Sequence, residues 1–222
     1  MPGIILMCDP CVAAIPVREC GERLRDVRYS RLLVDRSRQD AEGAFAHVRE
    51  GVLERLQRAQ SALPDGVRLL LVEGYRPPVL QEQYFERYVA WLRAANPQWS
   101  GTQVHRAASR FVAPPEIAPH TAGAAVDITL ADANGHELDL GTGTNATPEE
   151  SDGACYMDAK NISAKARYHR RILAHALAGA GLVNYETEWW HWSYGDRYWA
   201  MKTGSPTALY GPCSLPAQQG YP

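Results

Sequence analysis

The stretch "GAAVDITL", residues 123–130, restricts the fold of this chain more than any other. Such an apolar run predicts a buried β-strand, yet Asp127 lies inside it. A buried carboxylate without a partner costs free energy, so the fold must pair Asp127 or bind it to a metal ion. Backbone hydrogen bonds to the carboxylate are the simpler solution, and a metal site is the alternative.

A second polar pair lies in "ETEWWHWSY", residues 186–194, where three tryptophans surround Glu188 and His191. One interpretation is an aromatic core strand that holds two polar residues. The other is a site in which these two residues do chemistry behind aromatic walls. Residues three apart in an ideal strand point to opposite faces. A shared site therefore requires a bend or bulge in the strand, or a Glu188 side chain that reaches the site from outside its first layer of contacts.

A third stretch, "EGYRPPVL", follows the apolar run "VRLLLV" that predicts a buried strand. Pro77 favours an extended conformation of Arg76, which directs the guanidinium away from the strand end. An ion pair with an acidic neighbour is the structural interpretation of Arg76, and a place in a site is the functional one.

Taken together with His120, which lies three residues before the first stretch, these stretches indicate a zinc site. His120, Asp127 and His191 supply two imidazoles and one carboxylate, which leaves the fourth tetrahedral position open, as in catalytic zinc sites. Glu188 is then available as the base for a water molecule. The tryptophans are predicted to wall this pocket, excluding bulk water and lowering the local dielectric constant, rather than to form a core strand.

Long helices beside a few strands predict an α+β fold with a small central antiparallel sheet flanked by helices. The whole chain, 1–222, is expected to form a single domain with less regular segments at about 1–15 and 205–222. Helices are expected at about 40–60, 79–95 and 163–180, an irregular segment at 97–119, a surface loop at 141–160 and a last strand region at 182–194.

Composition excludes some partners for this chain. A net charge of −2 over 222 residues gives no reason to expect nucleic acid. No run is long and apolar enough for a membrane span, and no basic segment precedes the short N-terminal apolar runs. A cytoplasmic location without a secretory signal is therefore the expectation, and the oligomeric state is left open.

Five scattered cysteines do not suggest a disulfide framework. Cys8 and Cys11 form one C-x-x-C, with Cys20 nearby, and the second pair of a zinc ribbon is missing. Unliganded thiols are favoured over a structural metal there.

The stretches "HTAGAAVD" and "EWWH", with "GYRP" upstream, resemble the D-alanyl-D-alanine dipeptidases of the VanX type, within the zinc D,D-peptidases. The resemblance covers roughly residues 15–200. It implies that His120, Asp127 and His191 bind one Zn²⁺ and that Glu188 is the catalytic base. It also implies that Arg76 stabilises the transition state and that the substrate is a small dipeptide, D-alanyl-D-alanine or a close relative.

Two positions depart from the family pattern and bear on substrate preference. Ala118 stands where a serine is usual, and Asn145 stands where some members have an aspartate that can meet the substrate ammonium. A neutral amide holds an ammonium less strongly than a carboxylate does. Asp139, Glu149, Glu150 and Asp152 are the nearby acids that can compensate.

Two alternatives remain beside the dipeptidase. One is a zinc D,D-carboxypeptidase or peptidoglycan endopeptidase that acts on a longer peptide. The other is a non-catalytic, zinc-stabilised binding module. The usual mark of such a module is a lost base, whereas Glu188 and Arg76 are both present.

Overall fold

A five-stranded sheet in the order β2-β4-β5-β7-β6 forms the centre of the protein, and β1 pairs with β3 in a second, two-stranded sheet. The computed structural model describes residues 4–37, 40 and 42–215. The strands are β1 Leu24–Asp26, β2 Leu33–Val34, β3 His47–Arg49, β4 Arg68–Glu73, β5 Ala125–Ala131, β6 Val183–Asn184 and β7 His191–Ser193.

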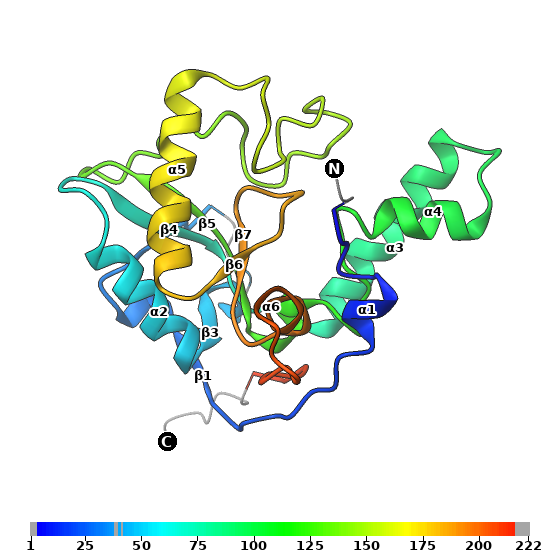
Figure 1. Cartoon of the computed structure of the whole chain (residues 1–222), viewed down its shortest axis with the longest axis horizontal. Helices are drawn as coiled ribbons and strands as arrows, with labels where there is room; N and C mark the ends of the chain where they lie inside the picture. The colour runs from blue at the N-terminus through cyan, green and yellow to red at the C-terminus, as the bar shows by residue number, and fades with distance from the viewer. Residues whose placement is uncertain (1–3, 38–39, 41, 216–222) are drawn as a thin grey trace.

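Helices surround this sheet (Figure 1). They are α1 Pro10–Ala13, α2 Glu50–Ser61, α3 Pro78–Ala95, α4 Gly101–Ala108, α5 Ala164–Gly179 and α6 Arg197–Thr203, with short 3₁₀ helices η1 Val27–Tyr29, η2 Ala44–Ala46 and η3 Pro119–Ala122. None of the described helices combines the length and apolarity needed to cross a membrane.

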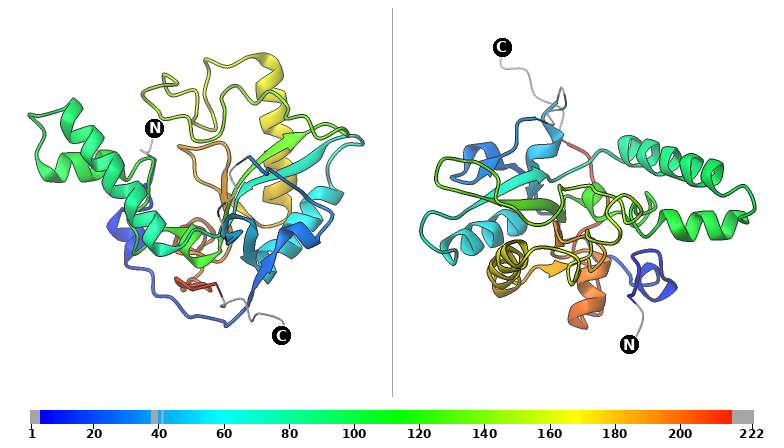
Figure 2. Two further views of the ribbon diagram at one scale, coloured as in Figure 1. Left: turned by 180° about the vertical axis from the view of Figure 1, so that it is seen from behind. Right: turned by 90° about the horizontal axis from the view of Figure 1, so that it is seen from above.

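The main hydrophobic core lies between the sheet and the helices α2 and α5, which pack against each other. Val126, Ile128 and Leu130 of β5 belong to this core. Because side chains alternate between the two faces of a strand, Asp127 points to the opposite face. The helices α3 and α4 extend away from the sheet (Figure 2) and have a small apolar cluster of their own.

The predicted α+β class is confirmed, with one parallel pair, β2 with β4, in an otherwise antiparallel sheet. The expected strands match β4 and β5, and the expected second and third helices match α3 and α5. Ser163 accepts a hydrogen bond from the amide of Ala166 at 3.0 Å, as an N-cap residue should.

Other predicted elements were wrong. The first helix, α2, begins only at Glu50, since His47–Arg49 pair with β1 as a strand. The segment expected to be irregular contains α4, which Ser100 and Gln103 start with a reciprocal capping box. Within the N-terminal segment expected to be less regular, the four residues Pro10–Ala13 form the short helix α1, which does not contradict that expectation. The outermost ends, 1–3 and 216–222, lie outside the described residues.

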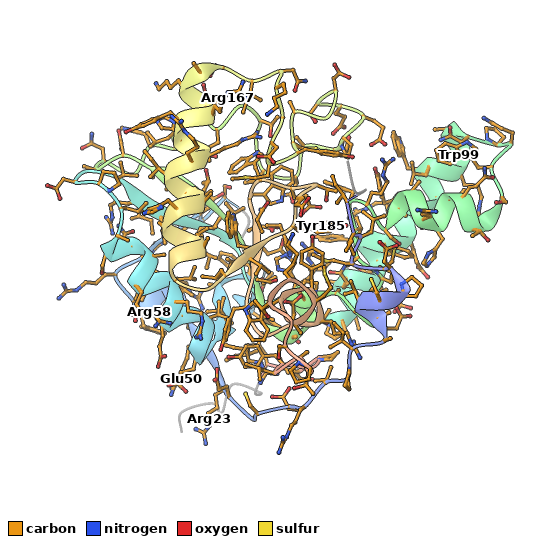
Figure 3. The ribbon with its side chains drawn as sticks, in the orientation of Figure 1. Arg23, Glu50, Arg58, Trp99, Arg167 and Tyr185 are labelled. Carbon is orange, nitrogen blue, oxygen red and sulfur yellow. The ribbon has the colours of Figure 1, made fainter. Side chains whose placement is uncertain are left out.

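The loop between β5 and α5 is held by Arg170, which is 2% exposed. Figure 3 draws the side chains as sticks, with Arg167 of the same helix labelled. The guanidinium of Arg170 donates hydrogen bonds to the carbonyl oxygens of Leu140, Tyr156 and Ala154 at 2.8, 2.7 and 2.8 Å. It also lies over the ring of Trp189, 5.4 Å from the centroid. Burial lowers the pKa of Arg170 to about 10.

Replacing Arg170 with methionine is expected to lower the free energy of unfolding by about 3 kcal/mol, because three buried carbonyl groups lose a charged donor. The measurement is urea unfolding followed by tryptophan fluorescence. Arg171→Met is the matched control, since Arg171 is exposed on the same helix and should cost less than about 0.5 kcal/mol. Equal losses for the two variants would contradict the role given to Arg170.

Candidate active site

Strand pairing brings Asp127 and His191 together. The two residues are direct partners in the antiparallel pairing of β5 with β7, so their side chains leave the same face of the sheet as neighbours. Nδ1 of His191 lies 3.1 Å from Oδ1 of Asp127. The core residues Val126 and Trp192 form the next pair and point to the other face.

His120 approaches the same carboxylate from η3, a short helix that ends at Gly123 with φ 64°. Its Nδ1 lies 2.6 Å from the carbonyl oxygen of Gly74. Since a carbonyl only accepts, Nδ1 carries the hydrogen, and in this tautomer of the neutral ring Nε2 is the nitrogen that can bind a metal ion. Glycine at position 74 lets the chain after β4 pack closely against β3, because a Cβ there would overlap the carbonyl oxygen of His47.

The three ligand atoms form a nearly equilateral triangle. Nε2 of His120 lies 3.2 Å from Nδ1 of His191 and 3.4 Å from Oδ1 of Asp127. Four ligands at the usual zinc distances of about 2.0–2.1 Å would stand about 3.3 Å apart at the corners of a tetrahedron. All three side chains are buried. The donor set and its spacing therefore fit a zinc ion.

The charge of Asp127 is stabilised by the same neighbours. Burial opposes ionisation, but His120 and His191 together lower the pKa of this carboxyl well below its ordinary value. Burial lowers the pKa of His191, which favours the neutral imidazole that a metal ion requires.

Glu188 lies in the turn between β6 and β7, not on a strand. The amide of Glu188 donates to the carbonyl of Tyr185, and the amide of His191 donates to the carbonyl of Glu188. This turn removes the alternation that would separate Glu188 from His191, and Oε2 of Glu188 lies 3.8 Å from Nδ1 of His191. Burial, together with the charge of Asp127, raises the pKa of Glu188 well above its ordinary value, an effect that a bound cation would oppose.

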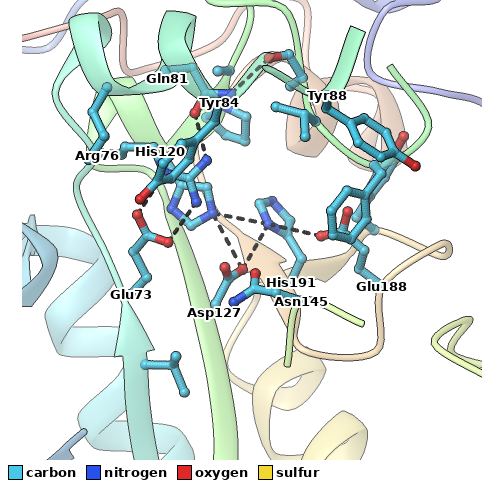
Figure 4. A pocket seen from close by; sticks show the side chains of 18 of the residues that line it. Glu73, Arg76, Gln81, Tyr84, Tyr88, His120, Asp127, Asn145, Glu188 and His191 are labelled. Atoms are coloured by element: carbon cyan, nitrogen blue, oxygen red, sulfur yellow. Dashed lines mark hydrogen bonds and ion pairs between the residues drawn. The ribbon is translucent and has the colours of Figure 1, made fainter. Parts of the chain in front are cut away.

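Arg76 lies across the pocket from Glu188 (Figure 4). Its guanidinium forms a bidentate pair with Glu73, both bonds being 2.6 Å, and Nη1 donates to Oε1 of Gln81 at 2.8 Å. Three of its five N–H groups are used in this way and two remain. Although burial opposes the charge, Glu73 keeps the pKa of Arg76 above its ordinary value. The ion pair considered from the sequence is therefore present, and it orients the guanidinium at the pocket.

The prediction that the tryptophans wall the pocket was wrong. Trp189, Trp190 and Trp192 are at most 3% exposed and belong to the main hydrophobic core. Trp189 also forms two hydrogen bonds on this core side. Its amide donates to the carbonyl of Cys155, and its indole donates to Oγ1 of Thr142 at 2.8 Å. These bonds tie the turn that carries Glu188 to the loop after β5.

The pocket above the site has a volume of about 900 Å³. Aromatic walls that the sequence did not indicate come from Phe45, Tyr84, Tyr88, Trp91, Phe111 and Tyr185. Ala118 and Asn145 both line the pocket, and so does Glu150. Glu149 instead accepts a hydrogen bond from the hydroxyl of Tyr88 at 3.2 Å.

The functional residues that the sequence interpretation missed are Glu73, Gln81 and Tyr84. The glutamate three residues before Arg76 was visible in "EGYR" as a candidate partner. Gln81 and Tyr84 lie three residues apart on α3, a spacing that places them on one face of the helix, but their contact with Arg76 required the structure.

Cys8, Cys11 and Cys20 are free thiols. Within 4–37, 40 and 42–215, the side chains His120, Asp127 and His191 form a group that could hold a metal ion.

The sequence of this chain is similar to those of known dipeptidases. Over 218 residues the chain is 28% identical to a D-alanyl-D-alanine dipeptidase of Synechocystis sp. (strain ATCC 27184 / PCC 6803 / Kazusa), covering 85% of this chain and 88% of that protein. It is 27% identical to the Escherichia coli (strain K12) protein of the same name over 126 residues, 57% of this chain and 54% of that protein.

A solved structure of a vancomycin resistance D,D-pentapeptidase, VanY, in complex with Zn(II), is 21% identical with a TM-score of 0.43, covering 78% of this chain and 84% of that chain. Residues 34–204 match the Peptidase_M15 family. The chain therefore belongs to this family, which is described as D-ala-D-ala dipeptidase.

Proposed function

We propose that this protein is a zinc-dependent dipeptidase that hydrolyses D-alanyl-D-alanine or a closely related dipeptide. The observation that carries the proposal is the triangle of His120 Nε2, Asp127 Oδ1 and His191 Nδ1, with edges of 3.1–3.4 Å, beneath a pocket that Glu188 and Arg76 also line. Family membership and the names of the two relatives support the same reaction.

His120, Asp127 and His191 would hold the zinc ion, one per chain. When bound, zinc supplies Lewis-acid polarisation of the scissile carbonyl and a lowered pKa for a water molecule. Hydrogen bonds to the ligand side chains, such as the bond from Nδ1–H of His120 to the carbonyl oxygen of Gly74, orient the ligands and fix their tautomers.

Glu188 acts as the general base. Its carboxylate accepts a proton from the attacking water as the new C–O bond forms at the scissile carbonyl carbon. The same proton then passes from Glu188 to the amine nitrogen as the C–N bond breaks, so that two amino acids leave and the carboxylate is restored. The distance of 3.8 Å from Oε2 of Glu188 to Nδ1 of His191 supports this role.

Arg76 stabilises the negative charge that develops on the scissile carbonyl oxygen. The pair with Glu73 and the bond to Gln81 hold the guanidinium in place, and its two remaining N–H groups are available to that oxygen. Preorganised donors of this kind contribute roughly 10²–10³ in rate.

The second candidate is cleavage of a longer peptidoglycan peptide, and the pocket volume favours it. About 900 Å³ is near the upper end for small-molecule sites and exceeds the needs of two alanines. The aromatic walls along α3 continue beyond the metal centre as far as Trp91, which is 48% exposed.

The test compares free D-alanyl-D-alanine with a pentapeptide that ends in the same two residues, using zinc-loaded protein. We expect kcat/KM to be at least about 100-fold higher for the dipeptide, because its ammonium can meet the acidic pocket walls and an acylated nitrogen cannot. A preference for the pentapeptide would establish the second candidate instead. Absence of hydrolysis of both peptides would refute the proposed peptidase.

A further inference from the structure

The charges that line the pocket are unevenly distributed. The lining carboxyl groups belong to Asp40, Glu73, Asp127, Glu150 and Glu188, and the lining guanidinium groups belong to Arg76 and Arg87. A substrate with a free terminal carboxylate is repelled by such walls unless a cation is available to receive it. Binding of such a substrate therefore depends on an arginine whose N–H groups are available to its carboxylate.

Three of the five N–H groups of Arg76 are used by Glu73 and Gln81, and the proposed function assigns the other two to the scissile carbonyl oxygen. Arg87 differs. Its side chain is exposed at the pocket, and no described residue gives it a hydrogen bond or an ion pair. Its guanidinium carbon lies over the ring of Tyr84, 5.0 Å from the ring centroid. A cation that is held by an aromatic face keeps all of its N–H donors for a ligand.

Tyr84 links the two arginines. The guanidinium carbon of Arg76 also lies 5.0 Å from the Tyr84 centroid, so the two guanidinium groups are no more than about 10 Å apart. Consecutive residues of a peptide are about 3.8 Å apart, and each guanidinium reaches its oxygen over a further hydrogen bond. A substrate can therefore meet Arg76 with the scissile carbonyl and Arg87 with a carboxylate one residue further along.

We propose that Arg87, supported by Tyr84, binds the C-terminal carboxylate of the substrate. The inference rests on the proposed function, because Arg76 must face the scissile carbonyl for the spacing to apply. It makes Arg87 a specificity-determining residue: the bond cleaved is the one that precedes a residue with a free carboxylate. A substrate with an amide or a further residue at its C-terminal end cannot form the ion pair with Arg87 there.

The kinetic test uses Arg87→Gln with D-alanyl-D-alanine and its C-terminal amide as substrates. We expect KM for the acid to rise about tenfold, while kcat changes less than about threefold. Tenfold is the low end of the effect of losing a hydrogen bond to a charged group, and it applies here because Arg87 is exposed. KM for the amide should not change. Arg87→Lys should recover most of the loss, since it keeps the charge. Arg93→Gln, an exposed position of the same helix, is the matched control and should match wild type.

A binding measurement tests the carboxylate subsite at Arg87 independently of the proposed dipeptidase activity. Zinc-loaded Glu188→Gln protein is titrated calorimetrically with the acid and the amide, with and without Arg87→Gln. Tighter binding of the acid that disappears with Arg87→Gln supports the subsite, even if the wild type hydrolyses neither ligand and the proposed function fails. Equal binding of acid and amide, no binding of either, or an acid preference that survives Arg87→Gln overturns it.

Discussion

Replacing Glu188 with glutamine is expected to lower kcat for dipeptide hydrolysis by about 10³-fold while the protein still binds about one zinc ion per chain. Glutamine keeps the size of the side chain and its place in the turn, but its amide cannot accept the proton of the attacking water. Oε2 of Glu188 stands 3.8 Å from Nδ1 of His191, close to the metal site without forming one edge of the ligand triangle. Loss of turnover with retention of metal is the signature that separates a base from a ligand.

The measurement is kcat together with zinc content by elemental analysis on the same preparation. Glu186→Gln is the matched control, because Glu186 lies two residues earlier in the same turn and pairs with Lys202 at the surface. That variant should keep kcat within about twofold, as expected for a solvent-exposed ion pair. If Glu188→Gln retains near wild-type turnover, Glu188 has no part in the mechanism.

Replacing Asp127 with asparagine is expected to weaken zinc binding by more than about 100-fold and to abolish turnover. Changes to residues that only orient ligands already cost about 10–100-fold in metal affinity, and here a ligand itself loses its charge. The change also leaves two imidazoles facing each other at 3.2 Å without the carboxylate that both of them contact. An amide oxygen is a weaker donor to zinc than a carboxylate oxygen.

Zinc affinity is measured by competition with a chromophoric chelator, and activity is measured after reloading with zinc. Wild-type protein stripped by the chelator should regain full activity on addition of zinc, whereas Asp127→Asn should not. Asp65→Asn, an exposed position in the turn after α2, is the control and should behave as wild type in both assays. Wild-type zinc affinity in Asp127→Asn would place the metal elsewhere.

Local elements of the fold were largely predictable from short stretches of sequence. The apolar run at 68–73 and the capping serine before α5 act over a few residues, so the periodicity and the cap were sufficient for β4 and α5. The helix α4 was missed although its start, Ser100 followed by Gln103, is a recognisable capping pattern. The start of α2 was wrong for a different reason: His47–Arg49 pair with β1, a contact that helical periodicity does not reveal.

The tryptophan cluster shows where residue type alone is insufficient. Apolar aromatic side chains suit a core and a pocket wall equally well, and the choice depends on which face of the sheet meets α2 and α5. Pairing of β7 with β5 placed Trp192 beside Val126 on the core side, so that His191 joined Asp127 on the other. The turn at Glu188 likewise depends on β6 pairing back onto β7.

By itself the sequence determined the functional groups of the candidate site: two imidazoles, two carboxylates and a guanidinium, together with most of the local elements that carry them. Only the tertiary structure decided which atoms meet, that Arg76 is held by Glu73, and that Arg87 beside Tyr84 has no hydrogen-bond or ion-pair partner among the described residues. Donor chemistry belongs to individual residues, whereas distances depend on the register between strands from distant parts of the chain. Asp127 and His191 are neighbours across 64 positions of sequence because the hydrogen bonds between β5 and β7 align them.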